Sequence, residues 1–193
     1  SSGEVLDNVV LKAPSGSSVV TPTTTIMEAA NITAEEVVAV LGLPAGVDPL
    51  SFNPYAANVD PVIALAVEKV SQQVMTTVTA VSSAIEGAGG DAAASFAMAL
   101  EAVVEVVKVK AEAVKEDPTA VVDFSNVEEI KSVTEIVSLK IEEEGIASKE
   151  SFESIETDLG AAVANVNLKI EAVTDLTSDD AQAAFAVSSE LKN

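Results

Sequence analysis

Apolar residues recur with a helical period through the chain from residue 60 onward. Ile63, Val67, Val70, Val74, Val78, Val81 and Ile85 follow one another at spacings of 4, 3, 4, 4, 3 and 4. This spacing places them on one face of an α-helix. Three further stripes of the same kind cover 96–114, 127–141 and 152–173. The pattern therefore predicts four long amphipathic helices.

Short polar or glycine-containing breaks separate these stripes. The breaks include "GAGGD" at 87–91, "KEDP" at 115–118, Gly145 and "DLTSDD" at 175–180, after which Ser178 is expected to cap a last short helix. Short connections favour antiparallel neighbours. We therefore expect a mainly α fold, an antiparallel up-and-down bundle of four long helices plus short helices, over residues 60–193. The Val-rich stretch 104–114 alternates like a strand, but the helical period of its N-terminal neighbours favours a helix.

Residues 21–59 predict two short helices and a proline-rich loop, packed with the bundle as one domain. Thr21 precedes Pro22 as an N-cap, and the run from Thr33 to Glu36 has the form of a capping box. Gly42 and Pro44 end the second helix. The loop carries two of the six aromatic residues of the chain, Phe52 and Tyr55, which we expect to fix it to the helical body.

Residues 1–20 have a different composition and predict an extended or β-strand arm. Its apolar residues are interrupted by the turn-forming run "SGSS". Twenty residues are too few for a stable sheet of their own. The arm is therefore expected to pair with another domain, the helical body or a second chain through its apolar residues, which are Val5, Leu6, Val9, Val10, Leu11, Val19 and Val20.

Composition and charge narrow the function classes. The formal net charge is −21, and the chain contains ten lysines but no Arg, His or Cys. We expect no nucleic-acid partner, because neutralising phosphates requires basic clusters and the sequence has none. No apolar run reaches the ~20 residues of a membrane span. The absence of His and Cys removes the commonest catalytic bases, thiolate nucleophiles and transition-metal ligands, so we expect no enzyme.

Carboxylate clusters are the remaining candidates for a metal site. Asp175, Asp179 and Asp180 stand near the start of the last predicted helix, and oxygen ligands of this kind bind Ca²⁺. The competing interpretation is a solvated helix end, where carboxylates are favoured by the helix dipole. A helix start also suits anions better than cations. The sequence predicts no other cofactor.

The segment from Leu11 to residue 56 resembles a junction in very long bacterial secreted or surface proteins, including adhesin-like proteins with cadherin-like or other β-sandwich repeats. There a run of the form "L-x-AP-x-G-(x)-VVTPLTTL" closes a β module, and a helix, "LGLP", an "FDP"-like turn and a helical domain follow. Two positions depart from that form: Thr23 replaces a leucine and Asn53 an aspartate. The matching residues are Leu11, Ala13, Pro14, Gly16, Val19 to Pro22, Thr24, Thr25, Leu41 to Pro44 and 51–56.

The resemblance implies an extracellular or cell-surface structural module with no catalytic residues. Combined with the arm, it predicts a protein that pairs with an adjacent β domain or with copies of itself, by strand addition, to build a fibre or sheath. The alternative is a helical-bundle binding module for a hydrophobic ligand or a cation, because bundles host such sites between their helices.

Overall fold

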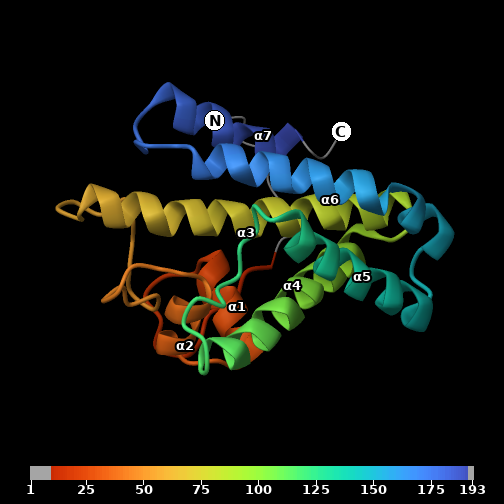
Figure 1. The fold of residues 1–193 in the computed structure, drawn as a ribbon, viewed down its shortest axis with the longest axis horizontal. Helices are drawn as coiled ribbons and strands as arrows, with labels where there is room; N and C mark the ends of the chain where they lie inside the picture. Colours follow the sequence, from red (N-terminus) through yellow and green to blue (C-terminus); the bar gives the residue numbers. More distant parts are fainter. Residues whose placement is uncertain (1–9, 191–193) are drawn as a thin grey trace.

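The computed structural model describes residues 10–190, and within this range it contains helices and loops but no strand. The predicted mainly α class is confirmed. The helices are α1 (Pro22–Ala30), α2 (Ala34–Val40), α3 (Pro61–Gly87), α4 (Ala92–Val114), α5 (Val127–Glu144), α6 (Lys149–Glu171) and α7 (Asp179–Glu190) (Figure 1).

Helices α3, α4, α5 and α6 form a bundle in which successive helices run in opposite directions (Figure 1). Helix α3 packs against α4 and α6, and α5 packs against the same two helices. Each long helix therefore has two neighbours in the bundle, and α3 and α6 close the ring. Along the described helices, none combines the length and the apolarity that crossing a bilayer requires.

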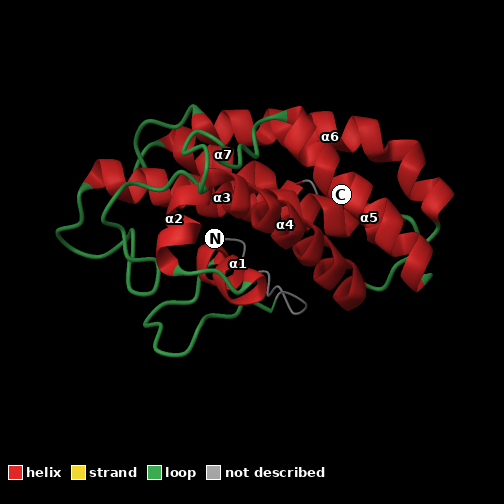
Figure 2. Ribbon diagram, turned by 60° about the horizontal axis from the view of Figure 1, so that its bottom comes forward, coloured by secondary structure: helices red, strands yellow, loops and turns green. Residues whose placement is uncertain are grey.

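The short helices cover two different sides of this bundle (Figures 1 and 2). Helix α1 packs on α3 and α4, and α2 packs on α4. Helix α7 lies across α3 and α6. The main hydrophobic cluster includes buried residues from the short helices and from the bundle, such as Ile26, Val37, Val78, Val103 and Phe152. A smaller cluster under α7 contains Val166, Ile170, Val173, Ala181 and Ala184.

The predicted helix starts are confirmed at the N-caps. The hydroxyl of Thr21 accepts a hydrogen bond from the Thr24 amide, and that of Thr33 accepts one from the Glu36 amide in a complete capping box. The Asp60 carboxylate accepts from the first amides of α3 after Pro61. These side chains satisfy amides that have no partner inside the helix, which is why the boundaries could be located.

The helical spacing predicts that the stripe over 152–173 includes Ile155 on the buried face of α6, and this position is an error. Phe152, Val163, Val166 and Ile170 are buried, but the side chain of Ile155 is 41% exposed. Ile155 lies between Phe152, which belongs to the hydrophobic cluster, and Leu159, which packs against it. The half-buried residue one turn after Phe152 is Glu156, whose Oε1 accepts a hydrogen bond from Thr134 Oγ1 of α5 at 2.8 Å. Helical spacing therefore identified the buried face but not which residue occupies its edge.

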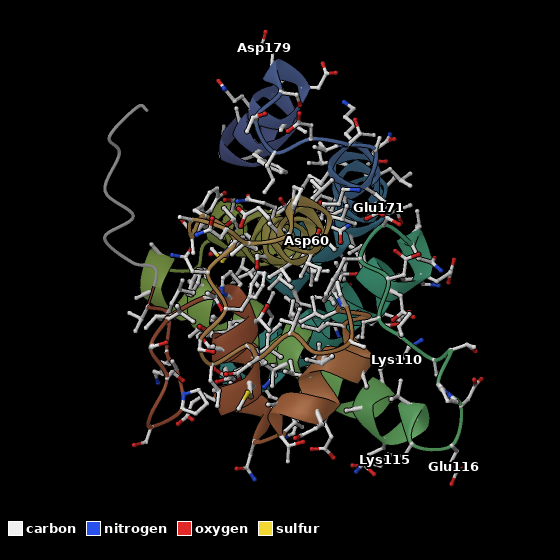
Figure 3. The ribbon with its side chains drawn as sticks, turned by 90° about the vertical axis from the view of Figure 1, so that its left-hand side faces the viewer. Asp60, Lys110, Lys115, Glu116, Glu171 and Asp179 are labelled. Carbon is white, nitrogen blue, oxygen red and sulfur yellow. The ribbon has the colours of Figure 1, made fainter. Side chains whose placement is uncertain are left out.

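Lysines of α4 and α5 connect neighbouring helices through ion pairs. The Lys115 Nζ lies 3.1 Å from Glu36 Oε1 on α2, and the Lys140 Nζ lies 2.9 Å from Glu101 Oε2 on α4. Lys110 pairs with Glu129 of α5, and Figure 3 shows Lys110 and Lys115 toward one end of α4. The pKa of Lys115 is raised, first by its hydrogen bond to Glu112 and then by Glu36. Exposed pairs of this kind each contribute little to stability.

The turn between α3 and α4 depends on Gly90. A Cβ at this position would lie 2.5 Å from Ser95 Oγ and 3.0 Å from Ile85 Cγ2. We expect Gly90→Ala to lower the free energy of unfolding by about 1–3 kcal/mol, because the turn must move to relieve the overlap. Chemical denaturation would measure this loss. Gly87→Ala is the matched control, since a Cβ there meets no atom within 4 Å, and an equal loss in both variants would contradict the steric explanation.

Candidate functional site

Two threonine hydroxyls hold the backbone of Lys12 at the start of α1. The Lys12 amide donates to Thr25 Oγ1 at 3.0 Å. The Lys12 carbonyl lies 2.9 Å from Thr25 Oγ1 and 3.3 Å from Thr24 Oγ1, and each of these hydroxyls shares its one proton between this carbonyl and that of Thr21. Both threonines are buried in the first turn of α1. We call the three hydrogen bonds with Lys12 the threonine clamp.

A second attachment fixes the chain just before α1. The Ser18 amide donates to the carbonyl of Leu50 at 2.8 Å, and the Ser18 hydroxyl donates to the same oxygen at 3.3 Å. The structure therefore does not support the predicted β-strand arm for residues 10–20. Their backbone folds onto their own helical body, one of the three partners that the sequence left open, and side-chain hydroxyls and a loop carbonyl supply the hydrogen bonds in place of a strand.

The predicted assembly residues are placed as follows. Val5, Leu6 and Val9 lie outside the described residues. Val10 is 60% exposed and Val20 is 59% exposed. Leu11 and Val19 are half-buried against the body. The described half of the arm thus divides its apolar side chains between solvent and its own core.

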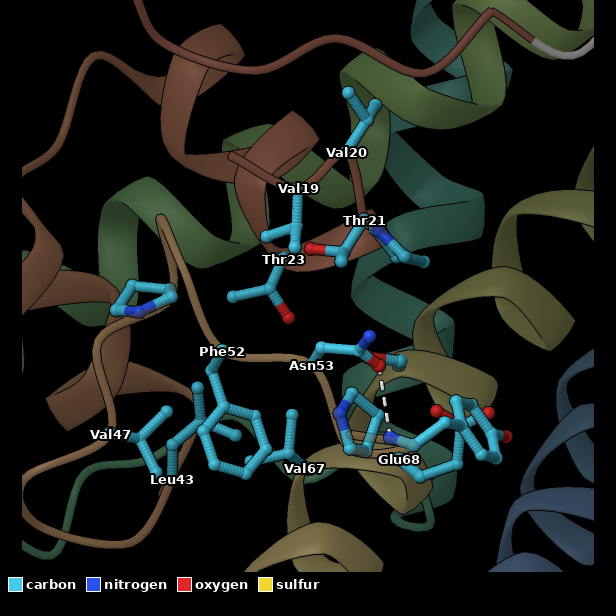
Figure 4. A pocket seen from close by; sticks show the side chains of 15 residues that line it. Val19, Val20, Thr21, Thr23, Leu43, Val47, Phe52, Asn53, Val67 and Glu68 are labelled. Atoms are coloured by element: carbon cyan, nitrogen blue, oxygen red, sulfur yellow. Dashed lines mark hydrogen bonds between the residues drawn. The ribbon is translucent and has the colours of Figure 1, made fainter. Parts of the chain in front are cut away.

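We call residues 10–20, which fold onto the helical body, the docked segment. A pocket of about 340 Å³ opens where this segment meets the proline-rich loop and α3. Val19 and Val20 line it from the docked segment, together with Thr23 from the first turn of α1. Figure 4 shows apolar side chains along the facing wall, from the loop and α3. These wall residues are Leu43, Val47, Phe52 and Val67.

Two buried polar groups also line this pocket. Glu68 of α3 is only 8% exposed, and its Oε1 accepts a hydrogen bond from Gln72 Nε2 at 2.8 Å. Thr23 is 3% exposed, and its hydroxyl oxygen has no hydrogen-bond partner. A buried hydroxyl without a partner is unusual and costs free energy. An apolar pocket with a few converging polar groups has the general character of a small-molecule site.

Tyr55 borders the same carboxylate. Burial raises the pKa of the Tyr55 phenol to about 12, together with the negative charge of Glu68 and a hydrogen bond to it. The phenol therefore stays protonated at neutral pH and can donate to Glu68. Tyr55 itself is 69% exposed, so this hydrogen bond lies at the solvent-facing side of the buried carboxylate.

The predicted metal candidates do not converge. No group of three or more carboxylates able to hold a metal ion occurs within residues 10–190. Asp175 Oδ1 instead accepts from the Thr177 amide and hydroxyl, each at 2.8 Å, which lowers the pKa of Asp175. Asp175 also shares a surface hollow with Lys69, and that ammonium group disfavours a second cation. Asp179 and Asp180 occupy the first turn of α7, as the helix-end interpretation expects.

Comparison with known proteins identified no relative. No family model, curated protein or solved structure matches the chain. Function must therefore be inferred from the residues and the geometry described above.

Proposed function

We propose that the chain is a non-catalytic structural module of an extracellular or cell-surface bacterial protein. The threonine clamp is the observation that supports this proposal, because it holds residues 10–20 against the helical body. Because the clamp fixes this segment to the helical body, a protein domain that contacts the segment would hold a fixed orientation relative to that body. The resemblance of residues 11–56 to junctions in bacterial surface proteins supports the same role.

This proposed role differs in one respect from the fibre-forming role that the sequence predicted. Strand addition by residues 10–20 would require free backbone groups, and the amides of Lys12 and Ser18 are already bonded within the chain. We therefore assign the structural role to a rigid junction. Any contact with a copy of the chain or an adjacent β domain would use exposed side chains such as Val10 and Val20.

Thr25→Val tests whether the clamp holds the junction. The substitution keeps the shape of the side chain but leaves the Lys12 amide without its acceptor, which costs about 1 kcal/mol or more. We expect trypsin to cleave after Lys12 about tenfold faster in the variant, because local opening controls cleavage. Thr23→Val is the matched control, since its hydroxyl bonds nothing. Equal cleavage rates in wild type and Thr25→Val would contradict a rigid junction.

Surface location needs a separate test in the source bacterium. Antibodies against the purified chain should label intact cells or the culture medium as strongly as permeabilised cells. Labelling that appears only after permeabilisation would overturn the extracellular assignment, whatever the clamp experiment shows.

A second candidate function is a binding module for a hydrophobic ligand or a cation. The pocket beside Glu68 favours it, because the pocket combines an aliphatic and aromatic wall with a buried carboxylate. This function does not compete with the structural role, since the pocket and the clamp use different threonines.

A further inference from the structure

We infer that the pocket between the docked segment and α3 binds a small organic ammonium ion, with the charged nitrogen at Glu68 and the apolar body against Phe52. This inference rests on the second candidate function, which it narrows to one class of ligand. It is independent of the structural role of the clamp.

The charge of the pocket selects a cation. Glu68 of α3 is buried, and the ion pairs of residues 10–190 do not include it. Its described partners, Gln72 and Tyr55, are neutral. A buried carboxylate is strongly stabilised when a cation reaches it. The net charge of −21 further raises the local concentration of cations and repels anions.

Thr23 supplies an independent observation. Its hydroxyl oxygen is buried, lacks any hydrogen-bond partner and belongs to the pocket lining. In Figure 4 this hydroxyl points toward Phe52 and Asn53. An N–H donor in the pocket would satisfy it. Thr23 therefore leaves one acceptor of the pocket lining without a partner, and Glu68 leaves one charge unpaired.

The remaining wall selects an apolar body rather than a hydrated metal ion. The side chains of Leu43, Val47, Phe52 and Val67 carry no oxygen ligands, and Glu68 is the one carboxylate in the lining, beside the neutral oxygens of residues such as Asn53 and Ser71. A hard cation such as Ca²⁺ requires about six to eight oxygen ligands, several of them charged. The apolar side chains suit an alkyl or aryl group, which gains free energy when it leaves water. A volume of about 340 Å³ lies at the lower end of the range of ligand pockets. The expected ligand is therefore a short alkyl or arylalkyl amine in its protonated form.

The test uses the full chain with hexylammonium and its neutral analogue hexanol, in matched titrations at neutral pH. Calorimetry would measure affinity, and amide chemical shifts would locate the site. We expect hexylammonium to bind at least about tenfold more tightly than hexanol, because charge-assisted hydrogen bonds are stronger than neutral ones. The largest shift changes should fall at Thr23, Phe52 and Glu68.

Variants separate the contributions of the two polar groups. Glu68→Gln should weaken hexylammonium binding about tenfold or more and leave hexanol unaffected. Thr23→Val should weaken it about threefold. Glu86→Gln is the matched control, because it changes an exposed glutamate of the same helix, whose hydrogen bond is to Ser82. Its affinity should equal that of the wild type.

Three outcomes would overturn the inference. Equal binding of hexanol and hexylammonium would remove the ammonium specificity and leave a hydrophobic binding module. Equal binding of hexylammonium and sodium would show that charge alone is recognised. The absence of binding and of shift changes up to millimolar concentrations would overturn both the inference and the second candidate function, without affecting the structural module.

Discussion

Phe152→Ala is expected to lower the free energy of unfolding by about 3–5 kcal/mol. Phe152 is fully buried in the first turn of α6, within the cluster that joins the bundle to α1 and α2. Removing its ring leaves a cavity that the surrounding aliphatic side chains cannot fill without moving backbone. Chemical denaturation followed by circular dichroism would measure the loss.

Ile155→Ala provides the matched control for this large-to-small change. Ile155 lies one turn further along α6 but is 41% exposed, so its replacement should change stability by less than about 1 kcal/mol. Similar losses at both positions would contradict the described orientation of α6. A small loss at Phe152 would contradict its place in the cluster.

Asn167→Ala should cost about 2–4 kcal/mol, the second large effect. The Asn167 side chain is fully buried and joins three parts of the fold. Its Nδ2 donates to Thr77 Oγ1 on α3 at 3.1 Å and to the carbonyl of Phe124, in the segment before α5, at 2.8 Å. Alanine would leave both acceptors buried without that donor and would also open a cavity.

Asn165→Ala is the corresponding control on the same helix. Asn165 is exposed, and alanine favours helix, so stability should stay the same or rise slightly. Equal destabilisation by the two substitutions would show that general helix effects, and not the buried hydrogen bonds, explain the loss at Asn167.

Helix positions could be predicted from the sequence because their signals are local. Thr21 and Thr33 cap the helices that follow them, and Gly145 ends α5 in the left-handed conformation. Each signal depends on residues within one turn of the boundary. The buried faces followed from the helical period. The error at Ile155 arose because Glu156, and not Ile155, takes the half-buried position one turn after Phe152, where it bonds Thr134 of α5.

The docked segment could not be predicted in this way. Its attachment depends on hydrogen bonds between residues 12 or 13 positions apart, and on one between Ser18 and Leu50. The sequence patterns predicted no hydrogen-bonding role for Thr24 and Thr25, which belong to the first short helix and to the resemblance. Threonine inside a helix is ordinarily neutral to unfavourable, so three consecutive threonines at the start of α1 were an available signal of side-chain bonding to another segment.

The burial of Asn167 could be predicted from the sequence, but that of Glu68 could not. Asn167 lies four residues after Val163 and three before Ile170, so its position on the apolar face of α6 follows from spacing alone. Glu68 directly follows the core residue Val67, and its burial depends on the loop that carries Tyr55. Long-range packing of that kind leaves no local pattern.

The threonine clamp has a mechanical consequence. A force pulling on residue 10 away from the body would reach Lys12 first and pass through two hydroxyls into the first turn of α1. That turn is backed by the buried side chain of Ile26 in the main cluster. The load would therefore fall first on these hydrogen bonds, so the segment before α1 should detach while the packed interior behind Ile26 stays folded.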